Sequence, residues 1–235
     1  MNKLSIVILT YNSQKYIYEV LKSIEFADEV LIVDSGSTDE TLSIANNFKN
    51  TRIIQQEWLG FGKQKQFGVE QAKNDWIFVL DSDEVFTKNL EEEVVKIMKE
   101  PHFKAYKVAR LNFFFGKAVK RLGLYPDYNI RFFDKNFARF DDKVVHEGII
   151  CHEKIGTLKN HFIHYAYENI EQFIEKQNKY SSLNSNKNNF FKAIVNPYWT
   201  FFKMYFIKKG FLEGKQGFVI AKLYAQYTFW KYIKD

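Results

Sequence analysis

The sequence is poor in cysteine and proline, and it has no long apolar run. One cysteine among 235 residues excludes an internal disulfide framework and fits a reducing compartment. Three prolines and eleven glycines exclude collagen-like chains and proline-rich linkers. No stretch reaches the roughly 18 charge-free apolar residues that a spanning helix needs. No small-residue cleavage site follows the first apolar run, Leu4–Thr10, so we expect a cytoplasmic protein.

The charge of the chain is distributed unevenly. Residues 1–186 carry 25 basic and 26 acidic residues, whereas residues 187–235 carry nine lysines and two acids. A basic tail of this kind predicts an anionic surface as partner. The tail contains no arginine, which is the usual reader of guanine, so its composition argues against nucleic acid. We therefore expect an anionic membrane surface as the partner of the tail.

Strand and helix patterns alternate over the first hundred residues. Continuous apolar, β-branched runs predict buried strands, and helical spacing or capping signals lie between these runs. The predicted strands are Leu4–Thr10, Glu29–Val33, Thr51–Gln55 and Trp76–Leu80, and the predicted helices cover about 13–25, a segment from Thr38, 64–73 and Asn89–Lys99. This order predicts an α/β fold with a Rossmann-like, mainly parallel central sheet and flanking helices.

The second half of the chain has a different texture. Short strand-like pieces and one helix are expected at Tyr106–Arg110, Asn129–Phe133, Gly148–Cys151, Leu158–His164 and 168–183. A polar, asparagine-rich linker follows at Ser181–Asn189. The tail after it should be helical, with breaks at Gly210, Gly214 and Gly217.

Polar residues follow three of the predicted strands. The three segments are Thr10-Tyr11-Asn12, Asp34-Ser35-Gly36-Ser37 and Asp81-Ser82-Asp83-Glu84. Ligands of parallel sheets bind outside the carboxyl ends of the strands. Two carboxylates two residues apart can bind one divalent cation, and phosphate oxygens can supply further ligands to the same cation. The alternative for Asp81-Ser82-Asp83 is a solvated turn, but the two neighbouring polar strand ends favour a binding site.

These segments resemble a known family of enzymes. The runs LSIVILTYN, VLIVDSGSTDET and DWIFVLDSDE, in this order and spacing, resemble family 2 glycosyltransferases of GT-A fold, closely over about residues 1–100 and more loosely over the next eighty. The later runs YPDYNIRFF and VHEG are similar to a short subgroup typified by lipopolysaccharide inner-core β-1,4-glucosyltransferases. The resemblance implies a GT-A domain over 1–186, with a nucleotide-sugar half (1–105) and an acceptor half (106–186). The residues of 187–235 themselves predict a helical, membrane-associating tail after it.

The resemblance also implies which residues bind the nucleotide-sugar. Thr10, Tyr11 and Asn12 fall where the family lines the nucleotide pocket. Asp34 and Asp39 fall where the family contacts ribose or base.

The motif after the fourth predicted strand is implied to bind both nucleotide and metal. Asp81, Ser82 and Asp83 fall on this motif, and Asp83 is the expected direct ligand. Because oxygen ligands select hard cations, the expected metal is Mg²⁺ or Mn²⁺. Lys65 falls in a segment that carries a basic residue in many members, although Gln66 stands where asparagine is usual.

Two more residues are candidates for the donor site. Arg131 is the one charge in an apolar predicted strand, and a buried arginine needs an anionic partner. That partner is either Asp127 or Asp134, or it is the diphosphate of the donor or a phosphate of the acceptor. His164 ends a predicted strand where the GT-A fold commonly supplies a third metal ligand, and the alternative is a buried, hydrogen-bonded histidine.

An inverting transfer needs a base that takes the proton of the acceptor hydroxyl. Glu147, next to His146 in the VHEG run, is the expected base. Asp141 and Asp142 lie close by in the sequence and are alternatives. A further alternative is that His146 and Glu147 only anchor a loop.

The expected protein is an inverting, metal-dependent glycosyltransferase. It moves a hexose, with glucose as the expected sugar, from a UDP-sugar to the inner core of lipopolysaccharide or lipooligosaccharide. The expected location is the inner face of the inner membrane, as a peripheral protein. One alternative is another lipid-linked glycan or a protein as acceptor. A distant alternative is a nucleic-acid-binding protein that uses the basic tail.

The tail has a pattern of its own. Fifteen of its forty-nine residues are aromatic. Aromatic and apolar residues recur at helical spacing in two stripes: Trp199, Phe202, Tyr205 and Phe206, and then Phe218, Leu223, Tyr227 and Trp230. Aromatic side chains beside lysines are typical of a helix that lies in a bilayer surface. The alternative is that these aromatics complete the core or form a dimer interface.

Overall fold

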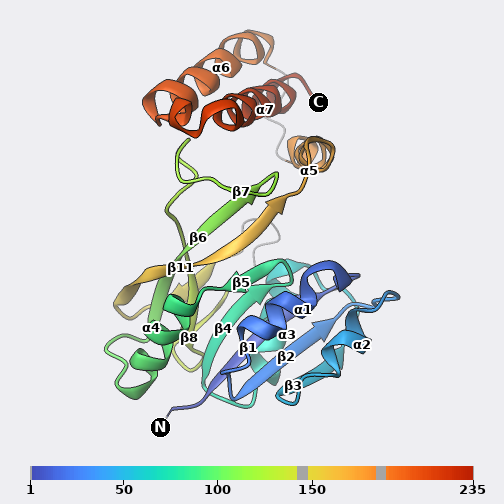
Figure 1. Ribbon diagram of the computed structural model, residues 1–235, viewed down its shortest axis with the longest axis vertical. Helices are drawn as coiled ribbons and strands as arrows, with labels where there is room; N and C mark the ends of the chain where they lie inside the picture. Colours follow the sequence, from blue (N-terminus) through green and yellow to red (C-terminus); the bar gives the residue numbers. More distant parts are fainter. Residues whose placement is uncertain (1, 142–147, 184–188, 235) are drawn as a thin grey trace. The chain divides into compact units, whose positions relative to one another are not determined.

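The computed structural model describes residues 2–141, 148–183 and 189–234, and the chain forms two compact units. Unit 1 comprises Met1–Arg110 and Asp127–His164, and unit 2 comprises Leu111–Pro126 and Tyr165–Asp235. Figure 1 colours the elements along the sequence. The boundary predicted after residue 186 stays a prediction. The donor, acceptor and membrane roles assigned to the three segments stay predictions.

Unit 1 begins with alternating strands and helices. They are β1 (Leu4–Thr10), α1 (Gln14–Ser23), β2 (Glu29–Asp34), α2 (Thr41–Ala45), β3 (Thr51–Gln55), α3 (Phe61–Gln71), β4 (Trp76–Asp81), β5 (Glu84–Phe86) and α4 (Lys88–Lys99). The four predicted strands are confirmed to within one residue. Helix α2 begins later than predicted, because the Asp39 carboxylate accepts hydrogen bonds from the Thr41 amide and hydroxyl just before the helix.

Further strands of unequal length follow along the chain. They are β6 (Ala105–Phe114), β7 (Lys117–Ala118), β8 (Asp127–Asp134), β9 (Ala138–Phe140), β10 (Ile149–Cys151) and β11 (Ile155–Tyr167). Strands β6 and β11 run on into unit 2, and β7 belongs to unit 2. The described residues form a nine-stranded sheet in the order β3-β2-β1-β4-β8-β6-β11-β5, with β7 paired to β6. Neighbours are parallel from β3 to β4, as predicted, whereas β8 is antiparallel to both β4 and β6.

The helices cover both faces of the parallel half of the sheet (Figure 1). Helix α1 contacts α2, and α3 packs on β1 and β2. Right-handed crossovers place α1 and α2 on one face and α3 on the other, because the chain reverses direction across the sheet after β3. Helix α3 comes very close to the sheet at Gly68, where a Cβ would lie 2.5 Å from Val7 Cγ1. This close packing holds α3 firmly beside the carboxyl ends of the strands.

Unit 2 is largely helical. It contains α5 (Ile170–Leu183), α6 (Phe190–Phe202), a π-helical turn η1 (Lys203–Ile207), a 3-10 turn η2 (Gly210–Glu213) and α7 (Gly214–Ile233). Its core joins apolar residues from several of these elements, among them Phe114, Phe173, Met204, Ile220 and Ala221. Helices α6 and α7 pack against each other (Figure 1). In the part of the chain that the structure describes, no helix is both long and apolar enough to cross a membrane.

The glycines of the tail have different roles. Gly210 and Gly214 lie at element boundaries, which confirms two of the predicted breaks. The predicted break at Gly217 is wrong, because this residue lies inside α7. Gly217 instead permits a close backbone approach, since a Cβ there would lie 1.9 Å from the Gly210 carbonyl oxygen.

Candidate active site

Three polar strand ends meet at one edge of the sheet in unit 1. Thr10 at the end of β1 is opposite Asp34 at the end of β2, and Leu9 is opposite Asp81 at the end of β4. The sequence predicted this convergence from the parallel order of the strands. The structure therefore brings the candidate residues of all three segments to the same edge.

Asp34 organises the first of these ends. Its buried carboxylate accepts hydrogen bonds from the Thr10 hydroxyl (2.7 Å), the Gly36 and Ser37 amides (3.0 and 2.8 Å) and the Ser37 hydroxyl (2.5 Å). Four donors on two oxygens fix the turn after β2. Asp34 and Thr10 thus shape the loop from behind.

The loop after β1 is held against the loop after β2. Asn12 has φ 49°, and its side-chain oxygen accepts a hydrogen bond from the Thr38 amide (2.9 Å). Asp39 accepts a hydrogen bond from the Gln14 amide (3.1 Å). Tyr11 is exposed between these contacts, so its ring is accessible to a ligand. The arrangement leaves one aromatic ring accessible beside a firmly hydrogen-bonded loop.

A serine pair connects this loop to the end of β4. The Ser13 hydroxyl donates a hydrogen bond to the Ser82 hydroxyl (2.8 Å), and the Ser13 amide donates to the Thr41 hydroxyl (2.7 Å). Ser82 therefore contacts the loop after β1 from within the Asp81-Ser82-Asp83 turn. No local pattern in the sequence indicates a role for Ser13.

Two cations meet the first aspartate of that turn. Lys65 Nζ on α3 lies 3.1 Å from Asp81 Oδ1, and Arg131 Nη2 on β8 lies 3.2 Å from Asp81 Oδ2. Burial raises the pKa of Asp81, but the charges of Lys65 and Arg131 outweigh burial and hold this pKa far below its usual range. The Asp81 side chain still keeps 33% of its exposure, so a ligand can reach it.

Glu84 completes the network, and the sequence did not single it out. Its buried carboxylate accepts a hydrogen bond from Arg131 Nη2 (2.9 Å) and another from the Asp81 amide (2.9 Å). Burial raises the pKa of Glu84, and the nearby Arg131 charge opposes this effect. Among the described residues, Arg131 forms its ion pairs with Asp81 and Glu84, and not with the expected Asp127 or Asp134.

The two aspartates expected as protein partners of Arg131 pair with other cations, and a phosphate partner for Arg131 stays a prediction. Asp127 instead receives two hydrogen bonds from Arg110 (3.0 and 2.6 Å), and Asp134 lies 3.6 Å from Lys104 Nζ. Strand β8 places Arg131 one residue beyond the Phe78–Phe132 pair, where its guanidinium reaches the end of β4. An isolated charge in an apolar strand signalled a buried ion pair, but it did not signal which carboxylates.

Asp83 faces a histidine from a distant strand. His164 Nε2 on β11 lies 3.6 Å from Asp83 Oδ2, because His164 is opposite Glu84 where β11 pairs with β5. A carboxylate oxygen is the kind of ligand that Mg²⁺ and Mn²⁺ favour, and a neutral imidazole can add one nitrogen ligand, with the remaining positions left to water and phosphate oxygens. No cluster of three or more His, Cys, Asp or Glu suited to a metal ion occurs among the described residues.

Helix α3 supplies Lys65 to the candidate site, whereas the next residue, Gln66, makes its hydrogen bonds outside this site. Gln66 Oε1 accepts a hydrogen bond from the Phe140 amide of β9 (2.9 Å), and its Nε2 donates to Glu70 (2.8 Å). Gln66 thus joins α3 to β9. Gln64, which is buried, donates to the Ser35 hydroxyl (3.1 Å) behind the turn after β2.

The candidate bases fall largely outside the described residues. His146, Glu147 and Asp142 lie in 142–147, which the structure does not describe. Asp141 is described, and its carboxylate accepts a hydrogen bond from the Gly148 amide (3.1 Å), while its own amide donates to the Gly148 carbonyl (2.9 Å). Asp141 and Gly148, the described residues on either side of 142–147, are therefore hydrogen-bonded to each other.

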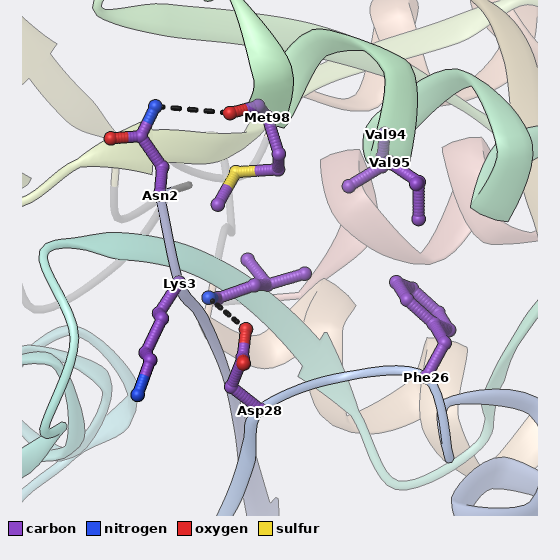
Figure 2. A pocket seen from close by; sticks show the side chains of 8 residues that line it. Asn2, Lys3, Phe26, Asp28, Val94, Val95 and Met98 are labelled. Carbon is purple, nitrogen blue, oxygen red and sulfur yellow. Dashed lines mark hydrogen bonds between the residues drawn. The ribbon is translucent and has the colours of Figure 1, made fainter.

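The pocket shown in Figure 2 lies away from these residues. It has a volume of about 250 Å³ and is lined by apolar side chains such as Phe26, Val94 and Met98. The Asn2 side chain donates to the Met98 carbonyl (3.0 Å), and the Leu4 amide donates to Asp28 (2.9 Å). Because β1 starts at Leu4 and ends at Thr10, this pocket lies at the opposite end of the strand from the candidate site.

Comparison with known proteins gives consistent matches. The family model described as Glycosyl transferase family 2 matches residues 5–162. A glycosyltransferase of Rickettsia bellii is 31% identical over 95% of this chain and 82% of its own length. The lipopolysaccharide core biosynthesis glycosyltransferase LpsC of Rhizobium meliloti is 29% identical over 96% of this chain and 89% of its own.

Solved structures match the fold. The crystal structure of Staphylococcus aureus TarS 1-349 in complex with UDP has a TM-score of 0.51 and 19% identity, covering 98% of this chain and 89% of that one. The complex with UDP-GlcNAc has the same TM-score and identity over 93% of this chain and 79% of that one. At this identity the match supports the fold alone, and it agrees with the GT-A architecture expected from the sequence.

Proposed function

The chain belongs to glycosyltransferase family 2, and from this premise we propose which transfer it performs. It moves a hexose, with glucose as the expected sugar, from a UDP-sugar to the inner core of lipopolysaccharide or lipooligosaccharide, with inversion at the sugar. The observation that carries the proposal is the convergence of Lys65 and Arg131 on Asp81, beside Asp83 and His164, at the carboxyl end of β4. The likeness to LpsC, a lipopolysaccharide core biosynthesis glycosyltransferase, over almost the whole chain supports a lipopolysaccharide core as the proposed acceptor.

Charge explains why a nucleoside diphosphate suits this edge of the sheet. A leaving diphosphate carries negative charge that must be neutralised as the sugar bond breaks. Lys65 and Arg131 are fixed there by their ion pairs with Asp81, so they need little rearrangement when charge develops. The exposed Tyr11 ring and the loop at Asn12 offer a surface for the nucleoside.

A divalent cation fits Asp83 and His164. The two side chains face each other at 3.6 Å, both keep some exposure, and together they present one oxygen and one nitrogen donor. Bound Mg²⁺ or Mn²⁺ supplies a positive charge that offsets the charge of the diphosphate. Asp81 is held by Lys65 and Arg131, so we assign it to fixing the turn and the nucleotide, and Asp83 and His164 to holding the metal.

The base in this proposal is Glu147, with His146 beside it and Asp141 or Asp142 as alternatives. A base takes the proton of the acceptor hydroxyl on the face of the sugar opposite the diphosphate. Asp141 uses one carboxylate oxygen to accept a hydrogen bond from the Gly148 amide, so it is the less suitable candidate, and Glu147 stays the proposed base. The acceptor is lipid-linked, so we also propose that the enzyme works as a peripheral protein on the cytoplasmic face of the inner membrane.

The test is turnover of the donor. The full chain is incubated with Mn²⁺ and with each of several nucleotide sugars, among them UDP-glucose and UDP-N-acetylglucosamine, and the released nucleotide is measured. Slow UDP release from UDP-glucose, accelerated by a lipopolysaccharide core acceptor, supports the proposal. If no UDP-sugar releases UDP, the proposed donor is wrong. If another lipid-linked glycan or a protein accelerates the release and a core acceptor does not, the proposed acceptor is wrong.

A further inference from the structure

Unit 2 exposes a continuous apolar surface along one helix. We name it the aromatic face, and it consists of Phe190, Phe191, Ile194, Val195, Tyr198, Trp199, Phe202, Phe206 and Ile207. Tyr198 and Phe191 keep 75% and 74% of their exposure. Apolar side chains gathered at this density on a surface mark an interaction site. The aromatic face is therefore a surface that needs an explanation.

The helical spacing puts these residues on one side of α6 and η1. Phe191, Val195, Tyr198 and Phe202 follow one another at steps of three or four residues. Ring contacts continue the surface past the helix end, with Trp199 5.9 Å from Phe202 and Phe202 5.3 Å from Phe206 between ring centroids. Ala193 and Met204, on the other side, are buried in unit 2.

The second predicted stripe does not share this exposure. On α7, Phe218 is exposed, whereas Leu223, Tyr227 and Trp230 are half-buried. Leu223 packs on the core of unit 2. The sequence left open whether the two stripes complete a core or form a surface. The structure divides them, because α7 contributes to a core and α6 presents an apolar surface.

The charges around the aromatic face select its partner. Residues 190–212 contain four lysines and no aspartate or glutamate, and all four lysines are exposed: Lys192, Lys203, Lys208 and Lys209. A second copy of the chain would bring the same lysines against one another. Anionic headgroups neutralise these charges, while aromatic rings enter the boundary between headgroups and acyl chains.

We propose that the aromatic face docks unit 2 onto an anionic phospholipid surface. Phe191, Tyr198 and Phe202 enter the boundary of the leaflet, and Lys192 and Lys203 contact the headgroups. Tyr198 and Trp199 carry a polar atom on an apolar ring, which suits the depth where water and lipid meet. The inference rests on the proposed function only for the reason why docking is useful, namely a lipid-linked acceptor.

The test compares matched pairs of substitutions in the full chain. One variant carries Phe191→Ser and Tyr198→Ser. Its control carries Phe137→Ser and Tyr18→Ser, which remove one exposed phenylalanine and one exposed tyrosine from unit 1. Binding is measured by co-sedimentation with vesicles of phosphatidylglycerol and phosphatidylcholine, and with vesicles of phosphatidylcholine alone. UDP release from UDP-glucose is measured in parallel without vesicles.

The original chain and the control should bind the anionic vesicles. The affinity of the aromatic-face variant for these vesicles should be lower by a factor of about ten or more. A Lys192→Gln and Lys203→Gln variant should lose about fivefold in affinity per lysine, on anionic vesicles only. The inference is overturned if the original chain does not bind the anionic vesicles, or if the aromatic-face variant binds them as tightly as the control does. If the original chain is a dimer, the aromatic-face variant is a monomer and vesicle binding is unchanged, the aromatic face serves self-association. That result also overturns the inference.

The two proposals fail separately. If vesicle binding behaves as expected and the original chain releases no UDP, the proposed donor chemistry is wrong and the docking surface stands. If UDP release is normal in all variants and vesicle binding is absent, the docking surface is wrong and the donor chemistry stands.

Discussion

Arg131 Nη2 lies 3.2 Å from Asp81 Oδ2 and 2.9 Å from Glu84 Oε1, so one guanidinium nitrogen joins the two carboxylates on either side of Asp83. Arg131 Nη1 also donates to the Val79 carbonyl (3.4 Å), which ties the same side chain to β4. The turn that carries Asp83 is therefore fixed from the neighbouring strand β8. Stability and ligand binding are both expected to depend on this contact.

Arg131→Ala should lower the free energy of unfolding strongly. Removing one partner of a buried ion pair leaves the other charge buried without compensation, which typically costs about 3–5 kcal/mol. Arg121→Ala, at an exposed arginine, should change the free energy of unfolding by about 0.5 kcal/mol or less. Urea denaturation followed by circular dichroism measures both. Equal midpoints for the two variants would show that the Arg131 contacts add nothing to stability.

The lowered pKa of Asp81 predicts how stability depends on pH. A carboxylate whose pKa is lower in the folded chain contributes stability that is complete above its unfolded pKa, about 3.9, and is lost as the pH falls through its folded pKa. The original chain should therefore lose this contribution on acidification below about pH 4. Asp81→Asn should be less stable at neutral pH and should show a flatter acid limb. Thermal unfolding across this range is the measurement, and parallel curves for the two proteins would contradict the ion pairs with Lys65 and Arg131.

Gly217→Ala should destabilise unit 2. A Cβ at this position would lie 1.9 Å from the Gly210 carbonyl oxygen, so the backbone must shift to admit one methyl group. Overpacking of this kind costs about 1–3 kcal/mol. Gln226→Ala, at an exposed position of the same helix α7, is the matched control. If Gly217→Ala melts at the temperature of the control or above it, the close approach of Gly217 to Gly210 is wrong.

Glu147→Gln should slow transfer by about 10²–10⁴-fold, because the amide cannot accept the proton of the acceptor hydroxyl. Its affinity for UDP should not change. Steady-state transfer and equilibrium binding of UDP separate the two quantities. A loss of less than about tenfold would move the role to Asp141 or Asp142, or to no side chain at all.

The sequence predicted the parallel half of the sheet because each strand there is a continuous apolar run between polar turns. It also predicted that Thr10, Asp34 and Asp81 would meet, since parallel order alone determines which strand ends share an edge. The partners of Arg131 could not be predicted in the same way. They depend on β8 pairing antiparallel to β4, and His164 meets Asp83 only because β11 pairs with β5. Such long-range pairings leave no local pattern in the sequence.

The tail illustrates the same limit. Both aromatic stripes have helical spacing, and only packing decides that Leu223 joins a core while Tyr198 stays exposed. A glycine inside a helix reads as a break from local propensity, yet Gly217 is where α7 comes closest to Gly210. Tertiary contacts determine both outcomes.

The most direct test of the account is metal-dependent turnover by an Asp83→Ala variant. UDP release from UDP-glucose is measured with a lipopolysaccharide core acceptor, with Mn²⁺ and with EDTA, for the original chain, for Asp83→Ala and for Asp75→Ala at an exposed aspartate. We expect that Mn²⁺ supports turnover by the original chain and by Asp75→Ala, and that EDTA abolishes it. Turnover by Asp83→Ala should fall to background while its unfolding midpoint stays unchanged. Near-normal turnover by Asp83→Ala in the presence of EDTA would contradict the metal-dependent transfer at the end of β4.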